Sequence, residues 1–568
     1  MDHHFFEKRC HYSIRKFAIG AASVMVGASI FGASMVQAAE TEPALEAETS
    51  LTQLPPEDKL SPELESAIKD AEADLVSETK VEEVATKSQA LEETSSKPVE
   101  TKNSTVEEKS TTVENASTEV APTETNAVTE PTKPAEVNGT VEKADSFTAD
   151  KPASKAEIDA AKSQVAKKEY TVFPRPQKVT YGDGVTALEG KVNLVFSDGL
   201  DIYTRNRAKE VLQASNVSYT TSTKATEGAT NIFLGVRGKA PLAEKEVQDI
   251  SSGLYDKIDA YVLRVKDNKI SIVGKDTDAV FFGLTTLKQM LKESSVPVLR
   301  DVTVEDYAEV KNRGFIEGYY GNPWTKENRE ELMRYGGDLK LTQYFFAPKD
   351  DPYHNAKWRE LYPEEKMSEI RDLARVGNET KTRYVWTIHP FMHNKMRFDT
   401  DELYKQDLDV IKAKFTQLLD AGVREFGVLA DDAAWPVGGY NSYVRLMTDL
   451  TNWLTEQEIK YSGLRKDMIF VPAWYMGQGT EDELRTLNER LPETVHLTLT
   501  GGKVWGAVDQ TFLTNLKKNL TEGGKKYRPI HFWINWPCND NTKQHLILGG
   551  GEKFLHPNVD LSLRMASC

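Results

Sequence analysis

The feature that most constrains this fold is a series of seven strand-then-helix units that begins after residue 310. Helices are predicted over 401–421 and 443–454, because apolar residues such as Leu403, Ile411 and Phe415 recur at helical spacing. Short apolar runs predict strands at 313–319, 343–347, 382–388, 425–429, 468–472, 496–499 and 529–534. Repeated units of this kind indicate a parallel sheet, and seven in a row favour a (β/α)8 (TIM-like) barrel over an open sheet.

The carboxyl-terminal end of the chain departs from this pattern. Only 34 residues follow Ile534, and they contain no recognisable eighth strand and helix. We therefore expect an incomplete barrel over 311–559 and an atypical tail over 560–568, as in a truncated or frameshifted form of a longer protein. A barrel that lacks one strand leaves its first and seventh strands with unpaired edges, which is a liability for stability.

A smaller α/β domain is predicted in front of the barrel, over 166–310. Its strands are expected at 170–173, 192–196, 231–235, 261–265 and 269–273, and its helices at 201–213 and 278–292. Residues 40–165 are mostly Glu, Thr, Ser, Ala, Lys and Pro, with few large apolar side chains. Such a segment cannot offset the entropy cost of ordering, so we expect a disordered spacer.

Residues 1–39 have the plan of a secretory signal. Lys8, Arg9, Arg15 and Lys16 precede an apolar stretch that ends in a small-x-small cleavage pattern. A membrane anchor is the alternative, because the stretch approaches the length that spans a bilayer. The sequence Tyr-Ser-Ile-Arg-Lys at 12–16 resembles the YSIRK-type signal of Gram-positive surface proteins, which implies secretion to the cell surface and association with the wall.

Charge separates the spacer from the folded part of the chain. The net charge is −16, but 40–160 holds 29 acidic and 11 basic residues, whereas 161–568 holds 56 of each. The neutral folded part has no basic stripe of the kind that binds nucleic acid. Cys10, Cys538 and Cys568 have spacings that fit neither a disulfide framework nor a metal cluster, so neither a metal nor a cofactor is expected.

Polar and aromatic residues gather where the predicted strands end. In a barrel of parallel strands these ends meet at one face, which carries the active site. The residues at these positions include Glu317, Gly318, Lys349, Asp350, Asp351, Asp431, Asp432, Trp474, Tyr475, Trp533, Asn535 and Asp540. Carboxylates, amides and aromatic rings on one face suit a sugar, whose hydroxyl groups need hydrogen-bond partners and whose apolar face stacks on rings.

The pair Asp431-Asp432, directly after an apolar strand, is the sharpest of these features. Two carboxylates forced together cannot both ionise freely, so one pKa is expected to rise, as a general acid near neutral pH requires. Glycosidases commonly use two carboxylates in this way. The alternatives are an ordinary loop pair or a cation site, and the run Asp350-Asp351-Pro352 has a comparable alternative as a turn.

Four sequence blocks resemble the signatures of glycoside hydrolase family 84. They are Gly-Phe-Ile-Glu-Gly-Tyr-Tyr-Gly-Asn-Pro-Trp at 314–324, Tyr-Phe-Phe-Ala-Pro-Lys-Asp-Asp-Pro-Tyr-His at 344–354, Asp431-Asp432, and the segment 533–540 that begins Trp-Ile-Asn. This family contains O-GlcNAcase-type β-N-acetylglucosaminidases, and its bacterial members are often labelled hyaluronidases. The segment 170–310 is similar to the small α/β domain that precedes the barrel in this family and in related hexosaminidases.

The resemblance implies a retaining mechanism in which the 2-acetamido group of the substrate attacks the anomeric carbon and forms an oxazoline. It implies that Asp431 orients the acetamido group and stabilises the oxazoline, and that Asp432 is the general acid/base. The substrate-binding residues that it implies are Gly318 and Lys349 at sugar hydroxyls, Tyr475, Trp533 and Asn535 around the acetamido group, and Asp540 at O4 and O6.

These features favour an exo-acting enzyme that removes terminal β-linked GlcNAc from glycoproteins or glycans. An endo-acting hyaluronidase is a second interpretation, although the neutral folded part shows no basic stripe for a long anionic polymer. A third is an inactive surface protein that only binds glycans, which the incomplete barrel makes credible. A carbohydrate is the expected partner in all three, and the sequence does not predict an oligomeric state.

Overall fold

The computed structural model describes residues 145–318, 323–504, 506–535 and, by their backbone alone, 566–567. The predicted signal at 1–39, the first part of the predicted spacer, and Asp540 lie outside these residues. In the part of the chain that is described, no helix is long and apolar enough to cross a membrane.

The amino-terminal domain is built on a mixed sheet with the strand order β1-β4-β3-β5-β7-β6-β8-β2. Its strands are β1 (Ser146–Phe147), β2 (Lys178–Ala187), β3 (Lys191–Phe196), β4 (Ser218–Ser222), β5 (Asn231–Val236), β6 (Ile258–Lys266), β7 (Lys269–Gly274) and β8 (Val298–Ala308). Strands β4, β3, β5 and β7 are parallel, and the remaining pairs are antiparallel.

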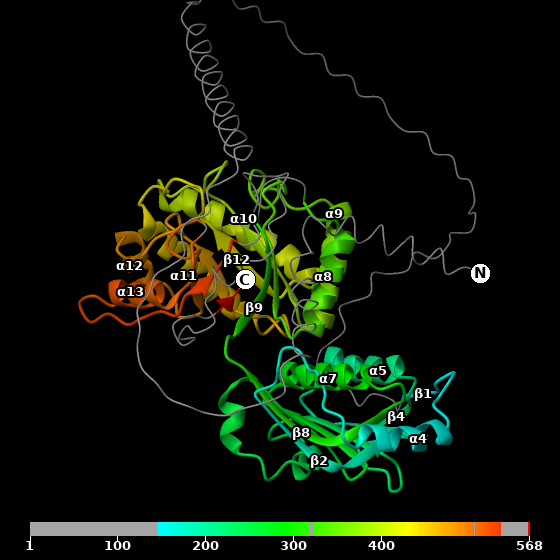
Figure 1. Ribbon diagram of the computed structural model, residues 1–568. Coiled ribbons are helices and arrows are strands. Elements are labelled where there is room, and N and C mark those ends of the chain that lie inside the picture. The colour runs from blue at the N-terminus through cyan, green and yellow to red at the C-terminus, as the bar shows by residue number, and fades with distance from the viewer. Residues whose placement is uncertain (1–144, 319–322, 505, 536–565, 568) are drawn as a thin grey trace, which may run out of the picture. The chain divides into compact units, whose positions relative to one another are not determined.

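Helices flank this sheet because their apolar faces pack against it. They are α4 (Lys155–Val165), α5 (Ile202–Ala214), α6 (Pro241–Lys245), the 3-10 helix η1 (Ser252–Asp256) and α7 (Thr277–Lys292). In α7, Asp276 caps the first turn by accepting a hydrogen bond from the main-chain nitrogen of Ala279, and Val280, Leu284 and Leu287 are buried in the core. Figure 1 shows α5 and α7 side by side.

The predicted spacer is wrong over residues 145–165, which are folded. Strand β1 pairs with β4, and Ile158, Ala161 and Val165 of α4 pack against Ala187 and Val298. Three apolar side chains at helical spacing are enough to bury one face of a short helix, although the composition of the surrounding segment hides them.

Strand predictions in this domain succeeded where the apolar run was continuous. The predicted helices and the strands β3, β5, β6 and β7 are present, but residues 170–173 form no strand. Strand β2 escaped prediction because it contains Gly182 and Gly184, and its pairing with β8 shifts between Tyr181 and Val185. Strand β4 is polar, and β8 alternates buried and partly exposed residues.

The second domain is the predicted barrel, with parallel strands in the order β15-β14-β13-β12-β11-β10-β9 and β16 beside β9. The strands are β9 (Asn312–Glu317), β10 (Gln343–Phe346), β11 (Arg383–Ile388), β12 (Glu425–Leu429), β13 (Met468–Val471), β14 (Val495–Leu499), β15 (His531–Phe532) and β16 (Ala566–Ser567). The helices are α8 (Lys326–Asp338), α9 (Glu364–Thr380), α10 (Asp401–Asp420), α11 (Tyr440–Gln457), α12 (Asp482–Arg490) and α13 (Gln510–Leu520). All seven predicted strands are confirmed.

The parallel sheet is nearly closed, which confirms the predicted fold class. The expectation that the first strand has an unpaired edge is wrong at its start, because Asn312 and Arg313 of β9 pair with Ala566 and Ser567 of β16. This two-residue pairing occupies the position of an eighth strand.

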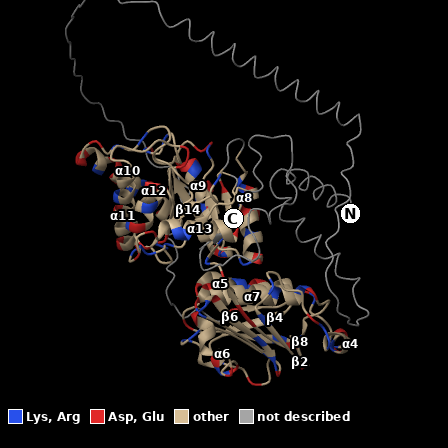
Figure 2. Ribbon diagram, turned by 60° about the vertical axis from the view of Figure 1, so that its left-hand side comes forward, with Lys and Arg blue, Asp and Glu red and all other residues tan. Residues whose placement is uncertain are grey.

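Two apolar clusters hold the barrel together. The larger lies between strands and outer helices, and the smaller gathers inward-facing residues such as Phe345, Val385, Leu429 and Val471. Figure 2 shows basic and acidic residues interspersed over both domains, in keeping with the neutral balance of 161–568.

Candidate active site

The end of β9 is fixed by a buried carboxylate. The Nε of Arg329 lies 2.8 Å from Oε2 of Glu317, and the main-chain nitrogen of Trp324 donates to Oε1 at 2.8 Å. The hydroxyl of Tyr344 also donates to Oε2. Both oxygens of Glu317 are therefore engaged, so this residue joins the end of β9 to Trp324 and to the first turns of α8.

Gly318 and Trp533 lie side by side, although they follow β9 and β15, the first and seventh strands of the barrel. A Cβ atom at Gly318 would lie 2.3 Å from the indole ring of Trp533, far inside van der Waals contact. Only glycine permits this approach. The structure therefore places these two candidate substrate-binding residues next to each other.

Lys349 and Asp431 form a buried ion pair. The Nζ of Lys349 donates to Oδ2 of Asp431 at 2.6 Å, and the two side chains are 2% and 8% exposed. Burial by itself raises the pKa of Asp431, but the positive charge of Lys349 and its hydrogen bond more than offset burial and lower that pKa. The expected rise from crowding therefore does not occur at Asp431. Its other oxygen, Oδ1, is buried with no hydrogen-bond partner among the described residues.

Two buried histidines near Asp431, His354 and His389, were not among the residues predicted from the sequence. The Nε2 of His389 donates to the main-chain oxygen of Asp431 at 2.7 Å, and the Nδ1 of His354 lies 2.8 Å from the main-chain oxygen of Thr387. Burial lowers the pKa of His389 to about 4 and that of His354 to about 3, so both rings are neutral at pH 7. His389 directly follows β11, so the strand-end criterion could have identified it.

Asp432 occupies a different environment from its neighbour. Its side chain is exposed, its φ is 54°, and its Oδ1 accepts a hydrogen bond from the hydroxyl of Tyr475 at 2.9 Å. Aspartate tolerates this left-handed conformation better than most residues. The two adjacent carboxylates are thus separated into one buried group and one exposed group.

Aromatic side chains complete the same end of the barrel. Tyr475 belongs to the inner apolar cluster, and Trp533 packs against that cluster. Asn535 donates from Nδ2 to the main-chain oxygen of Val504 at 2.9 Å. In the described part of the chain, no group of three or more His, Cys, Asp or Glu residues is arranged to hold a metal ion.

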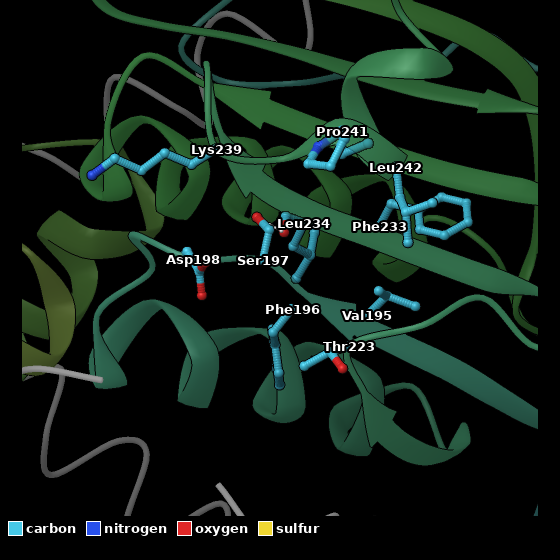
Figure 3. Close-up of a pocket in the computed structure, with 11 residues that line it drawn as sticks. Val195, Phe196, Ser197, Asp198, Thr223, Phe233, Leu234, Lys239, Pro241 and Leu242 are labelled. Atoms are coloured by element: carbon cyan, nitrogen blue, oxygen red, sulfur yellow. Dashed lines mark hydrogen bonds between the residues drawn. The ribbon is translucent and has the colours of Figure 1, made fainter. Parts of the chain in front are cut away.

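A separate pocket lies within the amino-terminal domain, at the carboxyl ends of β3 and β5. Its volume is about 190 Å³, and its lining combines apolar and polar residues. Figure 3 shows Asp198 and Lys239 at one end of it and Phe233 and Leu242 at the other. Since β3 lies between β4 and β5, the chain changes direction across the sheet here, a common position for small-molecule sites. The pocket contains no carboxylate pair.

A nearly closed parallel barrel with an aspartate pair, a buried lysine and aromatic side chains after its strands defines a carbohydrate-active barrel of the glycosidase class. Comparison with known families agrees. Residues 313–567 match the beta-N-acetylglucosaminidase family, residues 169–307 match domain 2 of glycosyl hydrolase family 20, and residues 7–32 match the YSIRK type signal peptide.

Relatives and solved structures extend this result. Protein O-GlcNAcase of Rattus norvegicus and that of Mus musculus are each 27% identical over 248 residues, which cover 42% of this chain and 25% of theirs. The structure of CpGH84D is 38% identical with a TM-score of 0.64, over 69% of this chain and 64% of that chain. CpGH84B is 27% identical with a TM-score of 0.55, over 66% and 63%. By these matches the chain resembles the β-N-acetylglucosaminidases of glycoside hydrolase family 84, and its residues 7–32 resemble a YSIRK-type signal.

The matched segment spans only a quarter of the length of the two O-GlcNAcases. The family match covers residues 313–567, and the signal match indicates secretion from a Gram-positive bacterium.

Proposed function

We propose that this protein is a retaining exo-β-N-acetylglucosaminidase that uses the 2-acetamido group of its substrate as the nucleophile. The observation that carries the proposal is the division of the aspartate pair, with Asp431 buried beside Lys349 and Asp432 exposed beside Tyr475. Two carboxylates in different environments can perform two different roles.

In the first step, the acetamido oxygen attacks C1 of the sugar as the bond from C1 to the leaving oxygen breaks. Asp432 gives its proton to that leaving oxygen. Asp431 stays ionised because of Lys349, and its unpaired Oδ1 accepts the hydrogen bond of the acetamido N–H. This contact orients the carbonyl oxygen for attack and stabilises the positive charge of the oxazoline.

In the second step, Asp432 acts as the base. It accepts a proton from a water molecule whose oxygen attacks C1, and the bond from C1 to the acetamido oxygen breaks. The product keeps the original anomeric configuration, because C1 is attacked twice from opposite faces. Gly318, Lys349, Trp533, Asn535 and Asp540 would hold the sugar, as the family resemblance implies.

The proposal is tested with Asp432→Asn, which keeps a residue that tolerates the positive φ. General acid–base catalysis is worth about 10²–10⁴-fold, so kcat on the 4-nitrophenyl glycoside of β-GlcNAc should fall by that order. The loss should be larger on glycosides with poorer leaving groups, which need the proton more. Asp409→Asn, on the exposed surface of α10, is the matched control. Full activity of Asp432→Asn would contradict the assignment of Asp432 as the general acid/base.

The role of the substrate has its own test. Adding fluorine atoms to the acetamido methyl group weakens the carbonyl oxygen as a nucleophile, so kcat should fall steadily from one to three fluorines. A rate independent of fluorination would rule out attack by the acetamido oxygen. Size analysis of digested glycans separates exo from endo action, because only the former releases monosaccharide from the first turnover.

We further propose that the signal and the acidic segment after it place the folded domains at the cell surface. The support is the YSIRK-type match and the excess of acidic residues over 40–160. Fractionation of the producing cells tests this, and recovery of the protein only in the cytosol would contradict it.

A further inference from the structure

Two exposed tryptophans lie at the edge of the candidate site. Among the tryptophans that the structure describes, Trp435 and Trp474 are the exposed ones, at 47% and 44%. Trp435 follows Asp432 by three residues in the loop between β12 and α11, and Trp474 directly precedes Tyr475 in the loop between β13 and α12. Exposed aromatic pairs next to a cleavage site are typical of ligand contact rather than of ordinary surface.

A buried carboxylate joins the loops that carry these tryptophans. Oε2 of Glu483 accepts a hydrogen bond from the indole nitrogen of Trp435 at 3.1 Å and from the main-chain nitrogen of Trp474 at 3.2 Å. Its Oε1 accepts from the main-chain nitrogen of Ala473 at 3.1 Å. Glu483 is only 1% exposed, in the first turn of α12. The two loops are therefore held as one unit, because the indole of Trp435 and the main chain at Trp474 share one oxygen atom of Glu483.

The same two loops meet a second time at the aspartate pair. The hydroxyl of Tyr475 donates to Oδ1 of Asp432 at 2.9 Å. The two loops that carry the tryptophans therefore meet at the carboxylate that serves the leaving oxygen in the proposed function. The group that departs with that oxygen lies on the Asp432 side of the cleaved bond, the side on which these loops meet.

We propose that Trp435 and Trp474 form a stacking platform for the leaving group, and that this leaving group is itself a sugar. The substrate is then a glycan with a terminal β-GlcNAc residue. This inference rests on the proposed function and deepens it. A pyranose ring presents an apolar face of C–H groups that an indole covers, and such contacts orient the sugar without a charged partner.

A peptide fits this surface less well. An extended peptide needs partners for its main-chain N–H and C=O groups. The nearest polar atoms of the platform, the indole nitrogen of Trp435 and the main-chain nitrogen of Trp474, already pair with Glu483. The YSIRK-type signal also directs the chain outside the cell, where exposed glycans are available.

The test compares two substrates that share the GlcNAc residue and differ in the leaving group. The fluoride of β-GlcNAc has nothing to place on the platform, whereas β-1,4-linked di-N-acetylchitobiose places a sugar there. Trp435→Ala and Trp474→Ala should each lower kcat/KM on the disaccharide by about five- to tenfold, mostly through KM, and change it on the fluoride by less than about twofold. The control is Ile459→Ala, a residue 96% exposed after α11 at the other end of the barrel, which should alter neither.

Three results would overturn the platform. They are equal losses on both substrates, no loss on either, and a larger loss on a GlcNAc-serine peptide than on the disaccharide. If the wild-type chain cleaves neither substrate, the proposed function fails, and binding decides the inference by itself. Disaccharide binding, followed by intrinsic tryptophan fluorescence with the Asp432→Asn protein, should then weaken in both tryptophan variants and persist in Ile459→Ala. Absence of any disaccharide binding would also overturn the platform.

Discussion

The candidate site has an inner part and an outer part that are built by different means. The inner part, Lys349, Asp431 and His389, is buried and joined by charge and by hydrogen bonds to the ends of neighbouring strands. The outer part, Asp432, Tyr475 and the tryptophan platform, lies on loops; Asp432 and the two tryptophans are exposed, and only Tyr475 is buried. The neighbouring residues Asp431 and Asp432 belong to different parts. The backbone adopts the left-handed conformation at Asp432.

This contrast separates stability from selectivity. A buried charge must keep its partner, so changes in the inner part should affect folding and catalysis together. Substitution of an exposed residue usually changes the free energy of unfolding only slightly. Changes in the outer part should therefore affect catalysis or substrate choice with little effect on folding. The predictions below test this division, from the largest expected effect to the smallest.

The largest effect is expected for Lys349→Met, which leaves the Asp431 carboxylate buried without its cation. Breaking a buried pair in this way costs about 3–5 kcal/mol of the free energy of unfolding. Without Lys349, burial also raises the pKa of Asp431, so the acid limb of the pH–rate profile should move to higher pH. Urea unfolding and the pH dependence of kcat/KM measure the two effects.

A double variant and a surface control sharpen this experiment. Lys349→Met combined with Asp431→Asn should recover much of the lost stability, because no buried charge remains, while activity stays low. Lys405→Met, on the exposed face of α10, should change neither quantity. A loss below about 1 kcal/mol for the single variant would contradict the division, since a median exposed pair contributes that much.

The inner part should also make stability depend on pH. The pKa of His389 is lowered from 6.5 to about 4 in the folded protein, so the unfolded chain binds a proton that the folded chain does not bind between these values. The stability that neutral His389 contributes is therefore complete above about pH 6.5 and is lost as the pH falls toward 4. In His389→Gln, whose amide can still donate to Asp431, the decline between pH 7 and pH 4 should be smaller by about 3 kcal/mol.

Urea unfolding between pH 7 and pH 4 measures this decline. The control is His393→Gln, because His393 is exposed and lies only four residues away. The buried His354 should retain part of the decline in both variants, since its pKa is lowered to about 3. Parallel curves for wild type and His389→Gln would show that His389 titrates alike in the folded and unfolded chains.

Particular residues show what the sequence could and could not reveal. Strand β12 carries the apolar residues Phe426, Val428 and Leu429, so both its location and the exit of Asp431-Asp432 from it could be predicted. The pairing of Lys349 with Asp431 joins residues 82 positions apart, and the family resemblance implied only that both lie at the sugar. The role of Glu483 was not predictable, because it depends on main-chain donors from Ala473 and Trp474 that any residues would supply.

The left-handed backbone conformation of Asp432 could not be predicted from the sequence either. Its φ is 54°, and nothing in the local sequence demands this value as a glycine would. The sequence therefore predicted two crowded carboxylates, whereas the backbone gives the two side chains different environments. At Asp431 the pKa is lowered, because the charge and hydrogen bond of Lys349 offset the effect of burial.

The smallest effect is expected in the outer part, for Tyr475→Phe. The phenyl ring preserves packing in the inner apolar cluster, but the hydrogen bond to Oδ1 of Asp432 is lost. A hydrogen bond of this kind contributes about 0.5–1.5 kcal/mol, so kcat should fall about three- to tenfold while the unfolding midpoint in urea hardly changes. The matched control is Tyr443→Phe, since the buried hydroxyl of Tyr443 has no hydrogen-bond partner among the described residues. The loss in the free energy of unfolding could instead equal the rise in the activation free energy of turnover. The outer part would then contribute to folding like the inner part, and the two would not be separable.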